Sequence, residues 1–191
     1  MISPIFCDAN ALLNGYGLFM SILKIAQMGH PVLREVCSPV PVDQISSPDV
    51  QNFIQDMFET MVDADGAGLA APQVHKPIRI AICTFDEGVI VLINPILTPI
   101  GEGKIATFEG CLSVDGLRGE VVRWESIHLE ARSQTGEKID INLHGWNAIV
   151  AQHECDHLDG VLFIDRCDTK TLAFLPEYAR YMQYSDTEGE E

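Results

Sequence analysis

The HExxH pattern at residues 153–157 constrains what this chain can fold into more than any other feature of the sequence. On a helix, side chains four residues apart lie on the same face, one turn apart, so His153 and His157 can both reach one metal ion. Glu154 points about 100° further round the helix, which puts its carboxylate beside the ion and not on it. There a carboxylate can take a proton from a water molecule that the metal activates. The pattern therefore predicts a helix that carries part of a hydrolytic metal site.

Two histidines leave such an ion short of protein ligands, and Cys111 is the best candidate for the third. A thiolate is a common ligand in mixed nitrogen and sulfur sites, although a lone cysteine is more often a small buried hydrophobic residue. Cys155 lies about 200° round the helix from His153, so we expect it to pack in the core. The wide spacing of the cysteines shows no disulfide framework and favours a reducing compartment. The same structural interpretation applies to Cys7, Cys37, Cys83 and Cys167.

Three segments, in this order, resemble the signatures of the peptide deformylase family. Residues 66–73 read GAGLAAPQ, residues 109–113 read EGCLS, and residues 152–158 read QHECDHL. The resemblance extends from about residue 22 to about residue 167. It implies an α+β fold in which antiparallel sheets pack around a central HExxH helix. It also implies a metal-dependent hydrolase that removes the N-formyl group from N-formylmethionyl nascent peptides and releases formate.

The resemblance also implies the catalytic roles. The two histidines and Cys111 correspond to the metal ligands, and Glu154 corresponds to a general base that later acts as general acid. The side-chain amide of Gln73 and the backbone N–H of Leu112 correspond to donors for the oxyanion, a task that suits neutral groups because they stabilise charge only as it develops. The family implies ferrous iron, Fe2+, as the physiological metal, and Zn2+ or Ni2+ can occupy such a site in purified protein. The residues alone specify two nitrogens and one sulfur, not the metal.

Further residues are candidates for contact with the peptide substrate. The glycines in Gly66-Ala67-Gly68 can serve simply as a helix C-cap and turn, or their missing side chains can let a peptide backbone pair as an added strand. Arg118 is either an ordinary surface arginine or, as the resemblance implies, a contact to the bound peptide backbone. Gly110, which flanks the candidate cysteine ligand, belongs to the same group.

The residues around the pentad have simpler interpretations beside the functional ones. Trp146, Ile149 and Val150 are most simply core residues, while the family suggests an apolar pocket there for a methionine side chain. Glu109 is expected to orient a metal ligand from behind. Asp156 can hold a ring N–H or a nearby arginine, and its sequence leaves that choice open.

Two other functions share the HExxH pattern. A zinc endopeptidase usually takes its third ligand from a residue downstream of the pattern, whereas His144 lies upstream. A non-catalytic metal-binding relative would need neither Glu154 nor Gln73, and this chain has both. An upstream thiolate from Cys111 therefore favours deformylation. One departure from the family is Asp115, which stands where proline is usual and can loosen its loop or add negative charge beside the site.

Length and composition predict one soluble, globular catalytic domain. The chain has 191 residues, of which 47% are hydrophobic and 21% charged, as in ordinary globular proteins. We expect the catalytic domain at residues 20–184 and an acidic tail at residues 185–191. Residues 1–19 form an N-terminal extension, either not native or disordered, which carries Asp8 and lacks the basic residues of a signal or transit peptide.

The charge balance limits the partners. A formal net charge of −16 argues against direct nucleic acid binding and against binding to anionic membranes. No apolar run approaches the roughly 20 residues of a spanning helix, so we expect a cytoplasmic, bacterial enzyme. The long basic C-terminal helix that some relatives use at the ribosome is missing, since Arg180 is the last basic residue. We therefore expect N-formylmethionyl peptides as partners and only a transient encounter with the translating ribosome.

Local patterns predict several elements. Ser47 as N-cap and Pro48 at the first helical position begin a helix whose apolar residues repeat every 3.6 residues to about Ala64. The HExxH helix is expected at residues 145–158, with Gly160 as its C-cap. Strands are expected at residues 22–25, 78–84, 89–93, 121–131 and 138–143, with turns at residues 86–88 and 134–136.

Overall fold

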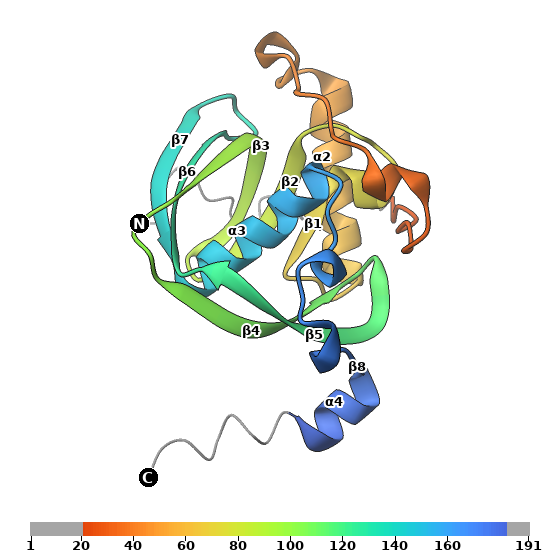
Figure 1. Ribbon diagram of the computed structural model, residues 1–191. Helices are drawn as coiled ribbons and strands as arrows, with labels where there is room; N and C mark the ends of the chain where they lie inside the picture. The colour runs from red at the N-terminus through yellow and green to blue at the C-terminus, as the bar shows by residue number, and fades with distance from the viewer. Residues whose placement is uncertain (1–20, 183–191) are drawn as a thin grey trace.

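A buried helix, α3 (Gly145–Leu158), lies at the centre of the computed structural model, which describes residues 21–182 (Figure 1). Its buried residues run almost without a break from Asn147 to Leu158, as expected for a helix surrounded on all sides. The other α-helices of this part of the chain are α2 (Pro48–Asp63) and the short α4 (Leu175–Tyr181). Within these residues, no helix combines the length and the apolar character needed to cross a membrane. The predicted extension and acidic tail lie outside the described residues.

Two antiparallel sheets surround α3, one with the strand order β1-β2-β3-β6-β7 and the other with the order β4-β5-β8. The first sheet contains β1 (Gly68–Ala70), β2 (Ile80–Phe85), β3 (Gly88–Pro99), β6 (Ser126–Arg132) and β7 (Lys138–His144). The second contains β4 (Lys104–Cys111), β5 (Val114–Trp124) and β8 (Ala173–Phe174). The expected α+β fold, with antiparallel sheets around a central HExxH helix, is confirmed.

Helix α2 forms where its sequence predicts. The Ser47 hydroxyl accepts a hydrogen bond from the Val50 N–H at 3.4 Å, and Pro48 occupies the first turn. One face of the helix packs on the first sheet, and full burial of each large apolar side chain contributes about 1.5–3 kcal/mol. That face therefore holds the helix in place, and it consists of Phe53, Ile54, Met57, Phe58 and Met61.

Strand β3 is buried on both faces. Val89, Val91 and Ile93 pack in the core cluster that contains α2, whereas Ile90 and Leu92 pack in the cluster that contains α3. Successive side chains of a strand point to opposite faces, so the first sheet lies between the two helices. This position explains why residues 89–93 form a continuous apolar run and do not alternate with polar residues. The predicted turn before the strand, at residues 86–88, is confirmed.

Residues 22–25 do not form the expected strand. The Leu23 N–H donates to the Thr60 hydroxyl at 2.9 Å, and the Ala26 N–H donates to the Gln73 carbonyl at 2.8 Å. These single hydrogen bonds join the segment to two different elements, so no ladder of strand pairs forms. The prediction was wrong because an apolar segment can pack on the core as irregular chain when groups of other elements satisfy its backbone N–H groups.

The expected strand at residues 121–131 is also wrong as a single element. It divides at Glu125, whose N–H donates to the Gly103 carbonyl and whose carbonyl accepts from the Gly145 N–H. The chain crosses there from β5 in the second sheet to β6 in the first. The β4–β5 hairpin was not predicted, and its turn carries Leu112 and Ser113. The strand and turn expected at residues 138–143 and 134–136 are confirmed.

Candidate active site

The structure brings the three predicted metal ligands together. Cys111 ends β4, while His153 and His157 lie on consecutive turns of α3. The Cys111 sulfur is 3.2 Å from Nε2 of His157, and one donor atom from each residue lies within 4.8 Å of the other two. Metal bonds of about 2.3 Å to sulfur and about 2.0 Å to nitrogen place such atoms roughly 3–4 Å apart, so the donor set fits one divalent ion. Burial lowers the pKa of His157, which keeps its imidazole neutral, as metal binding requires.

A buried ion pair orients His153 from behind. Nδ1 of His153 lies 2.8 Å from a Glu109 carboxylate oxygen, and Arg123 donates to both oxygens of the same carboxylate at 2.7 and 2.9 Å. Burial opposes ionisation of Glu109, but the hydrogen bonds from Arg123 and His153 outweigh it and lower the pKa to about 2. Glu109 therefore has the orienting position expected for it. Arg123 was missed, although a charged residue at an inward position of a strand, two residues from the buried Val121, was a usable signal.

Glu154 lies beside the three donors in a dry environment. Its side chain is 4% exposed, and burial raises its pKa to about 7. Among the described residues, Oε2 of Glu154 has no hydrogen-bond partner, so it is available to a bound molecule. A Cβ atom on Gly68 would lie 2.3 Å from Oε1. A side chain at that position would therefore force the Glu154 carboxylate to move, and glycine leaves room for it.

Gln73 presents its amide nitrogen to the site. Its Oε1 accepts from the Ala70 N–H at 2.8 Å, which leaves Nε2 facing the opposite way. Nε2 lies 3.2 Å from the Ser113 hydroxyl and 3.6 Å from the Cys111 sulfur. Because the side chain is 1% exposed and held at both ends, its direction is fixed before any ligand binds. Leu112 follows Cys111 in the β4–β5 turn, on the same side of the site.

The predicted substrate glycines also make close contacts within the protein. A Cβ on Gly66 would lie 2.9 Å from the Leu112 side chain, and one on Gly110 would lie 1.9 Å from the Arg118 guanidinium. Arg118 packs over Gly110 and donates to the Leu117 carbonyl at 2.9 Å. Internal packing is therefore one reason for these glycines, and their contact with a peptide stays a prediction.

One cavity, here called the metal cleft, joins these groups. Its volume is about 490 Å³, within the range of small-molecule sites. His157 lies behind it, 1% exposed. Trp146 is 52% exposed, whereas Ile149 and Val150 are buried. The lining of the metal cleft contains these predicted site residues: Gly66, Ala67, Gly68, Gln73, Gly110, Cys111, Leu112, Arg118, Trp146, Ile149, Val150, His153 and Glu154.

The cleft lining includes residues that the sequence did not point out. Phe108 precedes the EGCLS segment directly, so its place beside that motif was a usable signal. Leu175 is far from every motif and reaches the cleft only because β8 pairs with β5 at Leu117 and Arg118. The other missed residues of the lining are Ala64, Asp65 and Gly116.

Comparisons with known proteins agree with this geometry. The family model described as polypeptide deformylase matches residues 22–172. Peptide deformylase 1 of Prochlorococcus marinus (strain MIT 9313) is 42% identical over 170 residues, which cover 83% of this chain and 88% of the relative. The crystal structure of peptide deformylase from Thermotoga maritima is 37% identical, covers 77% of this chain and 98% of its own, and superposes with a TM-score of 0.72.

A further solved relative carries a peptide. The class I type b peptide deformylase from Acinetobacter baumannii, bound to Met-Ala-Ser, is 29% identical and covers 78% of this chain and 99% of its own, with a TM-score of 0.74. The family match spans nearly all of the described residues, and the curated relative is well above the identity at which family membership is secure. The chain therefore belongs to the peptide deformylase family, whose metal-dependent hydrolases remove the N-formyl group from nascent peptides.

Proposed function

We propose that Cys111, His153 and His157 bind one divalent metal ion and that Glu154 moves the protons of the reaction. The convergence of one sulfur and two imidazoles around a common point, with an unpartnered carboxylate oxygen beside them, carries this assignment. Glu109 holds His153 in place, since it accepts from Nδ1 and leaves the other ring nitrogen free for the ion.

The remaining groups suit hydrolysis of an N-formyl amide. When bound, the ion supplies Lewis acidity, which activates a water molecule and polarises the formyl carbonyl. Glu154 takes a proton from the attacking water and returns it to the leaving amine, two tasks that suit a carboxyl whose pKa burial raises to about 7. Nε2 of Gln73 and the Leu112 N–H donate to the developing oxyanion. The products are formate and a peptide with a free amino terminus.

We propose that the peptide lies along the wall formed by Gly66, Ala67 and Gly68, with Gly110 and Arg118 opposite. The methionine side chain then lies against Trp146, Ile149 and Val150. The solved relative with bound Met-Ala-Ser supports a peptide ligand for a cleft of this kind.

The expected physiological ion is Fe2+, as the family resemblance implies, with Zn2+ or Ni2+ as replacements in purified protein. Both the proposed ligand set and the metal are tested by anaerobic purification, metal analysis and a formate-release assay on a formyl-Met peptide. One iron per chain with high activity, both lost in Cys111→Ala, is expected. Unchanged metal content in that variant would contradict the ligand set.

The rival function is cleavage of internal peptide bonds. A thiolate ligand from β4, upstream of the HExxH helix, differs from the downstream ligand that endopeptidases usually have. The two activities are separated by comparing formate release with cleavage of an N-acetylated peptide that offers only internal bonds. We expect formate release alone, and cleavage of the acetylated peptide would favour the rival.

We propose that the enzyme works in the cytoplasm and meets nascent chains by diffusion. Helix α4 has seven residues and one arginine, Arg180, which lies 3.9 Å from Glu177. Such a helix offers little attraction for ribosomal RNA, whose binding needs clustered positive charge. Removal of residues 185–191 should leave co-sedimentation with ribosomes unchanged or slightly increased at low salt. A clear loss would instead indicate that the acidic tail recognises a protein partner.

A further inference from the structure

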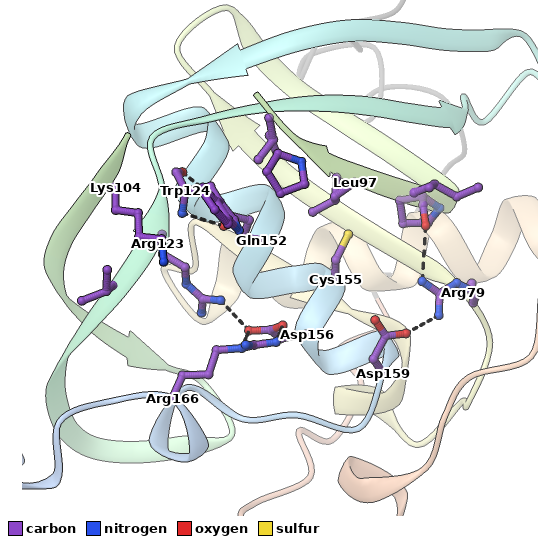
Figure 2. Close-up of a pocket in the computed structure, with 15 residues that line it drawn as sticks. Arg79, Leu97, Lys104, Arg123, Trp124, Gln152, Cys155, Asp156, Asp159 and Arg166 are labelled. Atoms are coloured by element: carbon purple, nitrogen blue, oxygen red, sulfur yellow. Dashed lines mark hydrogen bonds and ion pairs between the residues drawn. The ribbon is translucent and has the colours of Figure 1, made fainter. Parts of the chain in front are cut away.

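Helix α3 has a second cleft on the face opposite the metal ligands. Residues three or four apart on a helix lie on one side, so one stripe of this face carries Gln152, Cys155, Asp156 and Asp159. Figure 2 shows these side chains directed into the same hollow, which has a volume of about 540 Å³. This second cleft lies between the two sheets, and its lining comes from β3, β5, β6 and the start of β4 as well as from α3.

The walls of the second cleft are fixed by hydrogen bonds. The Gln152 side chain accepts from the Trp124 N–H at 3.0 Å and donates to the Trp124 carbonyl at 2.8 Å, which ties β5 to α3. At the other rim, Arg79 donates to Asp159 at 2.6 Å and to the Pro95 carbonyl at 3.3 Å, which joins the end of α3 to β3. Ligand sites are usually preformed in this way. The apolar part of the lining consists of Pro95, Ile96, Leu97, Pro99, Val122 and Ile127.

The second cleft is rich in cationic residues, although the protein is strongly acidic. Four of the chain's 12 lysines and arginines line it, against two of its 28 aspartates and glutamates. Both aspartates are already paired, because Asp156 accepts from Arg123 and twice from Arg166, and Asp159 accepts from Arg79. Arg79, Arg123 and Arg166 are paired in turn, Arg123 also with the buried Glu109, so the excess positive charge of the lining comes from Lys104. On a chain of net charge −16, this cation makes the second cleft a local site of attraction for anions.

Two donors remain for a ligand. Nζ of Lys104 lies 4.6 Å from the centre of the Trp124 ring, and Lys104 forms no ion pair with any residue in the described range. Arg166 is half exposed and bonds Asp156 through Nε and Nη2, so its Nη1 is not engaged by that pair. Both cations line the second cleft together with the apolar residues named above.

We propose that the second cleft binds a small organic anion, whose carboxylate or phosphate group contacts Lys104 and Arg166 and whose apolar body lies against Leu97, Val122 and Ile127. Charge-assisted hydrogen bonds select the head group, and burial of the body adds affinity. The inference does not depend on the roles proposed for the metal cleft, because no residue of this lining is assigned to catalysis.

The two tryptophans of the chain allow a direct test, since Trp124 lines the second cleft and Trp146 lines the metal cleft. The variant Trp146→Phe reports on the second cleft by fluorescence, and Trp124→Phe reports on the metal cleft. Each is titrated at constant ionic strength with hexanoate, hexyl phosphate and the uncharged isostere hexanamide. We expect a saturable change with the two anions when Trp124 is the reporter, and none with hexanamide. The stronger of the two anions identifies the head group as carboxylate or phosphate.

Charge variants made in the Trp146→Phe background locate the contact. Lys104→Met should weaken anion binding roughly tenfold, as expected for one lost charge-assisted hydrogen bond. Lys138→Met removes an exposed lysine on β7 that does not line the cleft, and it should change the midpoint by less than twofold. Equal binding of hexanamide, equal weakening by both variants, or a response of Trp146 alone would each overturn the proposal.

Discussion

Adjacent residues of one helix face two clefts whose linings differ in composition. His153 and Glu154 face the metal cleft, whereas Cys155 and Asp156 face the second cleft. The acidic residues lining the metal cleft are Asp65, Glu109, Asp115 and Glu154, against one arginine, Arg118. The cationic residues lining the second cleft are Arg79, Lys104, Arg123 and Arg166, against two aspartates. The comparison teaches that helical periodicity alone can separate two chemical environments within four residues of sequence.

Arg123 connects the two clefts: it lines the second cleft and bonds Glu109, which lines the metal cleft. It donates to Glu109, which orients His153 on one side, and to Asp156 on the other. Its side chain is 3% exposed, so it has no route to solvent if either partner is lost. One buried guanidinium therefore links a carboxylate of each cleft.

The largest effect on activity is expected from a substitution in the metal cleft, and the next residue of the helix, which faces the second cleft, serves as its comparison. Glu154→Gln should lower the rate of formate release by about 10²–10⁴-fold or more, since it removes the proposed proton carrier. Its metal content, measured in parallel, should stay at the wild-type level. Cys155→Ala, one residue further along α3, should retain activity within a few-fold. Comparable losses in both variants would mean that the helix does not separate the two functions.

Removal of the shared arginine should affect stability most. Arg123→Met leaves buried Glu109 with His153 as its remaining partner and Asp156 with Arg166, and breaking a buried ion pair costs about 3–5 kcal/mol. Urea unfolding monitored by circular dichroism measures this loss. Arg166→Met is the matched control, because Arg166 is 48% exposed and contacts Asp156 alone. A smaller loss for Arg123→Met than for the control would refute its role as the buried link between Glu109 and Asp156.

Within the metal cleft, Gln73→Ala should lower kcat by roughly 10²-fold, the scale of one lost oxyanion donor. KM should change less, since the donor acts mainly in the transition state. Steady-state kinetics on a formyl-Met peptide separates the two constants. An increase in KM at unchanged kcat would reassign Gln73 to binding of the ground state.

The smallest effect is expected at the rim of the second cleft. Asp159 is 55% exposed and pairs with Arg79, so Asp159→Asn should destabilise the fold by only about 0.2–1 kcal/mol. Thermal unfolding at low and high salt is the measurement, and the difference from wild type should shrink at high salt because solvent ions screen the pair. A loss as large as that of Arg123→Met would show that the rim is not solvated.

Elements with local signals could be predicted from the sequence, and those with distant partners could not. Helix α2 is defined by local signals: Ser47, Pro48 and an apolar period of 3.6 residues. The HExxH helix also has a local signal, the two histidines four residues apart. Leu23 and Ala26 satisfy their backbone N–H groups through Thr60 and Gln73, which no local pattern reveals. The crossover at Glu125 likewise depends on Gly103 and Gly145.

For the site, the sequence by itself determined the chemical inventory: two histidines four residues apart, a glutamate between them, and three ordered motifs with Cys111 and Gln73. Helical periodicity and residue chemistry act at short range, so they can be inferred from neighbours alone. Tertiary structure decided that Gly68 makes room for Glu154, that Arg123 lies behind Glu109, and that the far face of α3 opens into a second cleft. Those features arise from contacts between residues far apart in the chain, and their geometry exists only once the two sheets close around the helix.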